Sequence, residues 1–388
     1  MAEPRLTALS PDVQALVDAW TGFALDLYRA TGGAEENLVV SPSSVATVLA
    51  MVLPGARGAT ASEIAAVLHV GLDPERVAAA TGSLDAGLTE RAAEDELDLR
   101  ISNAVWAQAG LGLRPELVRL LGDAFRAGLR QVDFLRDTEG ARRAINALVA
   151  EQTAGKIPEL FDPGAIHPAT GLVLTNAIYL QARWLQAFDP DQTRPEPFHL
   201  LGGGTTKVDM LHRQASLDYA RGDGWRAVEL PYRGGRLVMD VIVPDQGGFA
   251  RFQDGLQAGR LGEVLASLKS REVRLALPKF TFDSDLDLGG TLQGLGMRTA
   301  FSREADFSGI TEDQDLYVDR VVQKAHVEVD ERGTTAAAAT GMTMRLVSMV
   351  APTAPVELRV DRPFLFAVRD RTTGALLFLG RVTNPSAP

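Results

Sequence analysis

Apolar positions in the first part of the chain recur at helical spacing. After Ser10-Pro11, an N-cap residue followed by proline at the first helical position, apolar side chains return every three or four residues until Gly32-Gly33 ends the pattern. Ser41-Pro42 is a second start signal. The segment 43–53 that follows it is apolar on nearly every face, which predicts a buried helix.

Four further helices are predicted in this half of the chain. Thr60-Ala61-Ser62-Glu63 has the residue order of a capping box, which opens a helix. Asp73-Pro74 is another start signal. The last two helices are expected over 115–125 and 138–153, from their apolar spacing.

Strand signals dominate the remainder. Residues 172–180 are apolar and nearly continuous, as expected for a central strand that is buried on both faces. The other predicted strands lie at 97–102, 237–243, 273–282, 317–331, 355–366 and 376–382. A helix over 286–295 interrupts them, and Gly202-Gly203-Gly204 is expected to form a hairpin turn. Helices come first and strands later, without a repeat or a linker, so we expect one α+β domain over residues 1–388.

Composition narrows the possible functions. Hydrophobic residues make up 46% and charged residues 23%, as in ordinary globular proteins. A net charge of -11 without a dense basic patch argues against a nucleic-acid partner. There is no cysteine, so disulfides and thiolate chemistry are excluded. No apolar run is long enough to span a membrane and no signal peptide is visible, so we expect a cytoplasmic protein, or a secreted one if a leader has been removed.

No motif indicates an enzyme or a cofactor. The HExxH, GxSxG and Walker patterns are absent, and the segment 202–207 resembles a phosphate loop only in composition. No two of the five histidines stand at i, i+4 spacing, so no metal site is expected. They are His69, His167, His199, His212 and His326. A catalytic triad is recognised by geometry and not by spacing, so a hydrolase with an unrecognised site stays open as an alternative.

One stretch near the C-terminus suits neither a core nor an ordinary loop. An alternating strand leads into Gly333, and from there to Thr340 no side chain is larger than threonine. In a strand, Thr334, Ala336, Ala338 and Thr340 would share one face, and each is small enough to slide over a packed sheet. Gly333 is a natural pivot. By composition alone, an alanine-rich loop or a short helix is an equally good interpretation.

The segment from Glu331 to Thr340 resembles the hinge of an inhibitory serpin, a serine protease inhibitor. Residues 360–366 resemble the signature that follows the reactive loop in that family. Further segments match in order at 37–44, 175–184, 277–280, 295–297, 305–309 and 384–385. The chain is identified as a member of the serpin family, of the prokaryote-like intracellular kind.

The resemblance implies a fold and a mechanism. N-terminal helices would pack on a large mixed main sheet, with two further sheets and an exposed reactive-centre loop at about 331–355. A target serine protease would cleave that loop and form an acyl-enzyme, after which the hinge segment would insert as a new strand and trap the protease. No charged, bulky or proline residue stands at the hinge positions, which favours inhibition over the alternative, a non-inhibitory serpin that binds a ligand or chaperones a partner.

Family spacing from the hinge puts the reactive bond at Val347-Ser348. Val347 would suit an elastase-like protease, Leu346 a chymotrypsin-like one and Arg345 a trypsin-like one. We expect a chymotrypsin-like or elastase-like partner. A monomer is expected, with a risk of polymerisation because the uncharged loop segment could add to a neighbour's open sheet.

Other family positions carry over by resemblance. Ser41, Ser44 and Asn176 fall at the shutter, where the central strands separate, and Trp184 falls at the breach, where insertion begins. Gln323 stands where many relatives have a shutter histidine, so no pH switch is expected there. The segment 73–96, where heparin-activated relatives carry basic residues, is mostly acidic, so no activation by heparin is expected.

Overall fold

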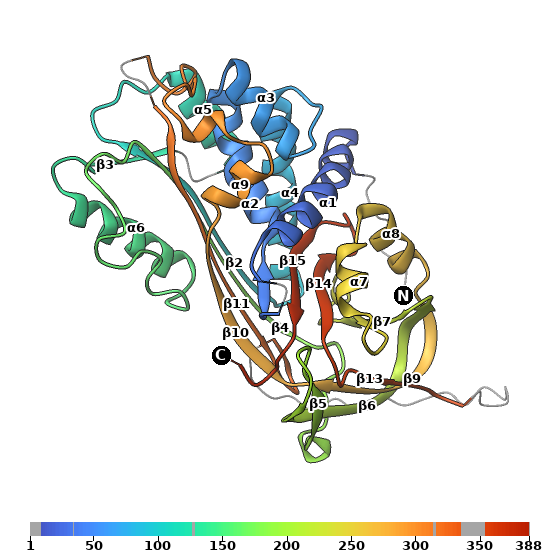
Figure 1. Ribbon diagram of the computed structural model, residues 1–388. Coiled ribbons are helices and arrows are strands. Elements are labelled where there is room, and N and C mark those ends of the chain that lie inside the picture. The colour runs from blue at the N-terminus through green and yellow to red at the C-terminus, as the bar shows by residue number, and fades with distance from the viewer. Residues whose placement is uncertain (1–8, 34, 126–128, 313–315, 335–353, 388) are drawn as a thin grey trace.

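A computed structural model describes residues 9–33, 35–125, 129–312, 316–334 and 354–387 (Figure 1). Its helices are α1 (Pro11–Ala30), α2 (Pro42–Val52), α3 (Gly58–Val67), α4 (Pro74–Glu94), α5 (Pro115–Phe125), α6 (Thr138–Gln152), α7 (Phe249–Asp254), α8 (Ala258–Ala266) and α9 (Gly289–Gly294), with short 3-10 turns at Leu53–Gly55, Pro190–Gln192 and Thr299–Phe301. Helices α1 to α5 and α9 lie on one side of a long sheet, and α6 lies alone on its other side (Figure 1).

That long sheet, the main sheet, has the strand order β10–β11–β4–β2–β3, and β12 also pairs with β4. Its strands are β2 (Asp98–Gln108), β3 (Leu129–Val132), β4 (Leu172–Arg183), β10 (Phe280–Asp287), β11 (Val318–Val329) and β12 (Gly333–Thr334). β11 runs parallel to β4, and β2 runs antiparallel to β4 on its other side. β4 is thus the central strand that its continuous apolar run predicts.

A second sheet has nine strands in the order β1–β15–β14–β8–β7–β6–β9–β13, with β5 also paired to β6. They are β1 (Leu38–Val40), β5 (Arg194–His199), β6 (Thr205–Gly222), β7 (Trp225–Pro231), β8 (Leu237–Pro244), β9 (Lys269–Pro278), β13 (Val356–Arg359), β14 (Phe364–Asp370) and β15 (Leu376–Val382). The two further sheets that the resemblance implies are therefore continuous here. The long β6 joins them, because it pairs with β5 near its start and with β7 near its end.

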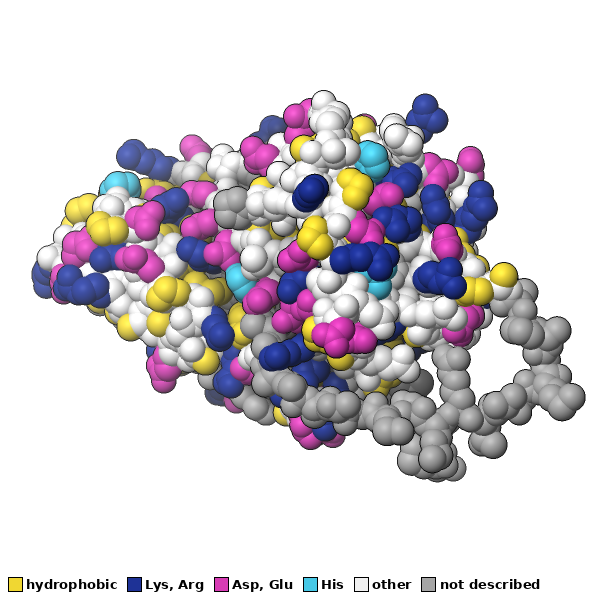
Figure 2. Space-filling view, turned by 90° about the horizontal axis from the view of Figure 1, so that it is seen from below, with side chains coloured by type: hydrophobic (Ala, Val, Ile, Leu, Met, Phe, Trp, Pro, Cys, Tyr) yellow, Lys and Arg dark blue, Asp and Glu magenta, His cyan; other side chains and the backbone are white. Residues whose placement is uncertain are grey.

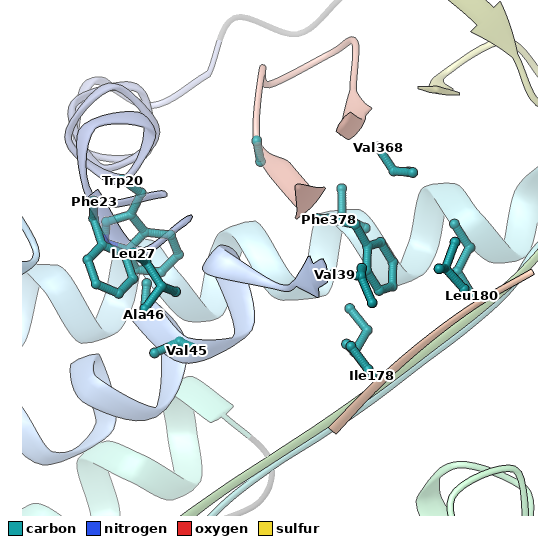
Figure 3. Close-up of a cluster of buried hydrophobic side chains, with 14 of the residues drawn as sticks. Trp20, Phe23, Leu27, Val39, Val45, Ala46, Ile178, Leu180, Val368 and Phe378 are labelled. Atoms are coloured by element: carbon teal, nitrogen blue, oxygen red, sulfur yellow. The ribbon is translucent and has the colours of Figure 1, made fainter. Parts of the chain in front are cut away.

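The hydrophobic core lies between the main sheet, α1, α2 and the strands β14 and β15. Every residue of α2 is buried, as its apolar faces predict. Figure 3 shows Trp20 and Phe23 of α1 beside Ala46 of α2, with Ile178 of β4 and Phe378 of β15 further along the same core. This packing places α2 directly behind β2 and β4 of the main sheet.

The predicted capping box is wrong. α3 begins at Gly58, two residues before Thr60, which lies inside the helix. The Thr60 hydroxyl instead accepts a hydrogen bond from the Asp306 backbone N–H, and the Glu63 carboxylate accepts one from the Thr299 backbone N–H. Both side chains cap a distant segment instead of their own helix, since tertiary partners replaced the local ones.

Two predicted strands are each divided in the structure, and one predicted helix begins too early. The run 273–282 becomes β9 and β10, which belong to different sheets, and the run 355–366 becomes β13 and β14. The helix expected over 286–295 is limited to α9, because β10 continues to Asp287, opposite Val322 of β11. The expected hairpin turn is confirmed, with Gly203 and Gly204 at positive φ between β5 and β6.

The surface carries charges of both signs. On the face in Figure 2, acidic and basic side chains are interspersed, and neither sign forms an extended patch. Within the ranges that the structure describes, no helix is long and apolar enough to cross a membrane.

Candidate functional site

The main sheet is open between its two central strands at one end. β11 and β4 pair in parallel from Val318 to Ala325, where Ala325 lies opposite Ile178. Beyond that point, the rest of β11 pairs only with β10 among the described strands, while the end of β4 pairs with β12. β4 and β11 are thus no longer paired with each other at the end of the sheet where Gly333 lies.

Gly333 turns the chain back toward β4. Its φ is +143°, and a Cβ atom there would lie 2.0 Å from the Ala182 carbonyl oxygen, so only glycine fits. Gly333 pairs with Arg183 and Thr334 pairs with Ala182, both antiparallel. The sequence predicts Gly333 as a pivot in an exposed loop, but the structure seats it, buried, against the end of the main sheet.

The turn before Gly333 is closed by Asp330. The Asp330 backbone N–H donates to the Gly333 carbonyl at 2.9 Å, and its Oδ1 accepts from the backbone N–H groups of Arg332 at 2.8 Å and Gly333 at 3.0 Å. These bonds use the local side-chain-to-backbone pattern that aspartate favours in turns. These hydrogen bonds stabilise the turn that leads into Gly333.

Trp184, expected at the breach, anchors this turn. Its indole Nε1–H donates to the Asp330 carbonyl at 3.0 Å, and its backbone N–H donates to the Arg332 carbonyl at 2.9 Å. The buried indole ring stacks on Tyr232 at 4.6 Å between centroids. Because one tryptophan binds the turn through both its side chain and its backbone, movement of the turn must disturb the packing beneath it.

Glu331 fixes the other side of the turn. Its carboxylate accepts hydrogen bonds from Lys279 Nζ at 3.0 and 3.2 Å and from Thr193 Oγ1 at 2.8 Å. Burial opposes ionisation of Glu331, but its own backbone N–H, Lys279 and Thr193 together outweigh burial and hold its pKa below the ordinary value. The side chain therefore carries its charge at neutral pH.

Further along the sheet, three amide side chains form a row across three strands. Asn103, Asn176 and Gln323 stand directly opposite one another on β2, β4 and β11. Asn176 donates to Asn103 Oδ1 at 2.5 Å, and Gln323 Nε2 donates to Asn176 Oδ1 at 2.6 Å. Gln323 also exchanges two hydrogen bonds with the Ser41 backbone at the start of α2, at 2.9 and 3.0 Å. We call these three residues the amide row.

The residues expected at the shutter are thus only partly linked. Ser41, Asn176 and Gln323 share hydrogen bonds, but the Ser41 contribution comes from its backbone. The buried hydroxyls of Ser41 and Ser44 have no hydrogen-bond partner within the described ranges. The role of these residues as a shutter stays a prediction.

Sequence reasoning missed Asn103, Asp330, Lys279 and Thr193. Lys279 lies in a segment that resembles the family, but nothing local showed that it would bind Glu331. Asn103 continues a predicted strand as a polar residue, which was a weak signal. The other expected site residues lie outside the described residues: Ala336, Ala338, Thr340, Arg345, Leu346, Val347 and Ser348.

Three of the five histidines contact a carboxylate, and His212 does so with Glu196 at 3.0 Å. His69 contacts Asp26 at 2.8 Å, and His326 contacts Asp283 at 2.5 Å. In the described part of the chain, no three His, Cys, Asp or Glu side chains gather as they would around a metal ion. In the predominantly acidic segment 73–96, Arg76 pairs with Asp12 and Arg91 with Asp370, so each of its two basic residues is engaged within the protein.

Comparison with known proteins agrees with this geometry. The family model for serpins (serine protease inhibitors) matches residues 18–385. A serpin-like protein of Thermococcus kodakarensis is 38% identical over 371 residues, covering 95% of this chain and 86% of that protein. The leukocyte elastase inhibitor of Bos taurus is 35% identical over 384 residues, covering 96% of this chain and 100% of that protein. The solved structure of Serpin48 from Tenebrio molitor is 32% identical with a TM-score of 0.83. The match covers 96% of this chain and 98% of that one. The chain belongs to the serpin family, and its α+β architecture is the serpin fold.

Proposed function

We propose that this chain is a suicide-substrate inhibitor of serine proteases, consumed in a single reaction and not a catalyst. The observation that carries the proposal is the antiparallel pairing of β12 with the end of β4, at the point where β4 and β11 are no longer paired. This pairing supports the proposal that the hinge would continue as a new strand between β4 and β11. The whole chain, 1–388, would act as one domain, with its reactive loop at about 331–355.

The register of β12 predicts where the rest of the hinge would go. Continued in the same register, Ala336 would come opposite Leu180, Ala338 opposite Ile178, and Thr340 opposite Asn176. Residues directly opposite in a sheet point to the same face. Leu180 and Ile178 belong to the core that α2 covers, so the inserted residues at these positions would enter packed space. Small side chains at alternate hinge positions meet that requirement.

The chemistry follows from the loop sequence. The catalytic serine of the protease would attack the carbonyl carbon of Val347, and the bond to Ser348 would break with protonation of the Ser348 amine. The ester that remains joins the protease to the segment ending at Val347. Insertion would add on the order of 10 ladder hydrogen bonds of about 0.5–1.5 kcal/mol each, comparable with the roughly 5–15 kcal/mol that stabilises a typical domain.

The target would be an elastase-like or chymotrypsin-like serine protease. Val347 suits the first and Leu346 the second, and the similar bovine protein is named as an inhibitor of leukocyte elastase. Arg345 is the alternative for a trypsin-like enzyme.

The test is incubation with pancreatic elastase, chymotrypsin and trypsin, followed by a denaturing gel and sequencing of the released peptide. A complex that survives denaturation, with a new N-terminus at Ser348, supports the proposal. Cleavage of the loop by all three proteases without any such complex would overturn it in favour of a non-inhibitory serpin.

Two adjacent substitutions test insertion itself. Thr334→Arg places a charge opposite buried Ala182, whereas Thr335→Arg would place it opposite half-buried Gln181. The measured quantity is the number of inhibitor molecules cleaved for each complex formed. We expect this number to rise at least tenfold over wild type in Thr334→Arg and to stay within about threefold of wild type in Thr335→Arg. Undiminished inhibition by Thr334→Arg would contradict the insertion step.

A further inference from the structure

A cavity of about 350 Å³ lies at one end of the second sheet, between two turns and the helices α7 and α8. Gly224 belongs to the turn that joins β6 to β7, and residues 245–248 follow β8. The Asp245 backbone N–H donates to the Gly224 carbonyl at 2.9 Å, so the two turns form one wall. Figure 1 shows α7 and α8 together on the opposite side of the molecule from α6. The volume lies within the range of roughly 300–1,000 Å³ that is usual for small-molecule sites.

Two arginine side chains line the cavity without a negatively charged partner. Arg251 of α7 is exposed, and Arg260 of α8 is half-buried. Within the part of the chain that the structure describes, neither guanidinium makes a hydrogen bond or an ion pair. A guanidinium stays charged at any ordinary pH, so the wall carries two unpaired positive charges.

Arg260 is held in place by an aromatic ring. Its guanidinium carbon lies 4.4 Å from the centroid of the Phe252 ring, as in a cation–π contact. Gly255 leaves room for this arrangement, because a Cβ atom there would lie 2.6 Å from Arg260 Nη1. The ring covers one face of the guanidinium, and the N–H groups around its edge stay free to donate. A planar guanidinium of this kind matches the oxygens of a phosphate group.

The same wall carries two exposed carboxylates, Asp223 and Asp245. Asp245 Oδ1 lies 3.8 Å from Arg226 Nη2, which offsets part of its charge, while Asp223 has no ion pair among the described residues. Carboxylates accept hydrogen bonds from hydroxyl groups and oppose a second anionic group. A ligand that satisfies the whole wall therefore has one anionic end and hydroxyl groups on its remainder.

Glycines keep the wall between the arginines and the carboxylates open. Gly224 and Gly247 line the cavity with φ of +79° and +72°, in the left-handed region that favours glycine. A Cβ atom at either position would meet no atom within 4 Å. The space beside the backbone is thus free for a ligand.

We propose that this cavity binds a phosphorylated sugar. The phosphate lies between Arg251 and Arg260, and the sugar hydroxyls donate to Asp223 and Asp245. None of the lining residues belongs to the main sheet or to the hinge turn, so nothing in this assignment depends on protease inhibition.

The test is isothermal titration calorimetry of the full chain at pH 7.5, with glucose 6-phosphate as the probe. Glucose and inorganic phosphate serve as the two halves of that ligand. We expect saturable binding of glucose 6-phosphate, binding of phosphate that is at least tenfold weaker, and none of glucose, because only the whole ligand engages both the arginines and the carboxylates.

Substitutions divide the site into its two parts. Arg251→Gln and Arg260→Gln should each weaken binding of glucose 6-phosphate at least tenfold, as expected for loss of a charge-assisted hydrogen bond. Arg271→Gln makes the same charge change at an exposed position of β9 outside the cavity, and should leave the affinity within twofold. Asp223→Asn should weaken glucose 6-phosphate at least threefold without weakening phosphate.

Thermal denaturation of each variant establishes that it is folded. Equal binding by wild type, Arg251→Gln and Arg260→Gln would overturn the proposal, as would the absence of glucose 6-phosphate binding to wild type. Phosphate that binds as tightly as glucose 6-phosphate would also overturn it, because the site would then recognise an anion and not a sugar.

Discussion

Asn176 Oδ1 accepts a hydrogen bond from Gln323 Nε2 at 2.6 Å, and this bond joins β4 to β11 across the line that an inserting strand would have to open. Both side chains are almost completely buried. Breaking the bond without a replacement would leave two polar groups unsatisfied, which costs about 1–3 kcal/mol each. Thr340 would arrive opposite Asn176 in the extrapolated register, where its hydroxyl could take over one of them.

Removal of the central amide should destabilise the native state. In Asn176→Ala, the side chains of Asn103 and Gln323 each lose a buried partner, so we expect a loss of about 2–4 kcal/mol in the free energy of unfolding. Urea denaturation followed by circular dichroism measures it. The control is Ser44→Ala, whose buried hydroxyl has no partner among the described residues and whose loss should cost less than about 0.5 kcal/mol. Equal destabilisation by both changes would contradict the importance of the row.

Gln323 should make insertion insensitive to pH near neutrality. An amide donates and accepts hydrogen bonds without titrating, whereas a histidine at this position would change its charge between about pH 5 and 8. The rate of loop insertion is measured after a heat pulse at each pH. We expect this rate to be independent of pH in wild type and to change in a step near neutrality in Gln323→His. A step of the same size in both proteins would show that another group is responsible.

The Glu331 contacts should stabilise the hinge in a pH-dependent way. The folded-state pKa of Glu331 lies below its unfolded value, so its contribution is complete above the unfolded pKa and disappears as the pH falls through the folded pKa. Glu331→Gln should therefore lower the free energy of unfolding by about 1–2 kcal/mol at pH 7. In acid, its stability should approach that of wild type. Thermal denaturation over pH 3 to 7 measures this difference.

A double-mutant cycle with Lys279→Met assigns that loss to a partner. If the Lys279 ammonium is the main donor, the second substitution should cost much less in Glu331→Gln than in wild type. Fully additive losses would assign the Glu331 contribution to Thr193 and the backbone instead.

The effect of Asp85 on stability should change with pH in the opposite direction to that of Glu331. Burial raises its folded-state pKa to about 7 from 3.8, so wild type loses stability as the pH rises between these values. Asp85→Asn lacks this loss and should gain about 2 kcal/mol over wild type between pH 4 and 8, less than the full shift implies because the residue is half-buried. Denaturant midpoints at the two pH values measure the gain, with Glu75→Gln, an exposed change on the same helix, as the control. A difference between Asp85→Asn and wild type that does not change with pH would contradict the buried-carboxylate argument.

Much of the fold could be read from local pattern. Helix α5 has the predicted bounds because its apolar residues follow helical spacing. Strand β15 also has the predicted bounds, β4 is the central buried strand, and α2 is buried on all sides, because each of these three segments is largely apolar. Resemblance in turn supplied Trp184, Asn176 and Gln323. The family itself could be identified from the hinge composition and the ordered motifs.

The tertiary structure decided which strands pair with one another and which residues the polar side chains bind. The run 273–282 is predicted as one strand, yet it changes sheets at Lys279, because β9 pairs with β6 and β10 pairs with β11. Thr60 and Glu63 follow the order of a capping box but bind residues more than 200 positions away.

The functional site shows the same division. The sequence by itself determined that residues 334–340 are small enough to enter a sheet, because size and charge are properties of each residue. Only the folded chain decided that Gly333 already lies against Arg183, that Glu331 meets Lys279, and that Asn103 extends the row of Asn176 and Gln323. The register between strands that are 70 to 150 residues apart is set by the whole sheet, and no local pattern encodes it.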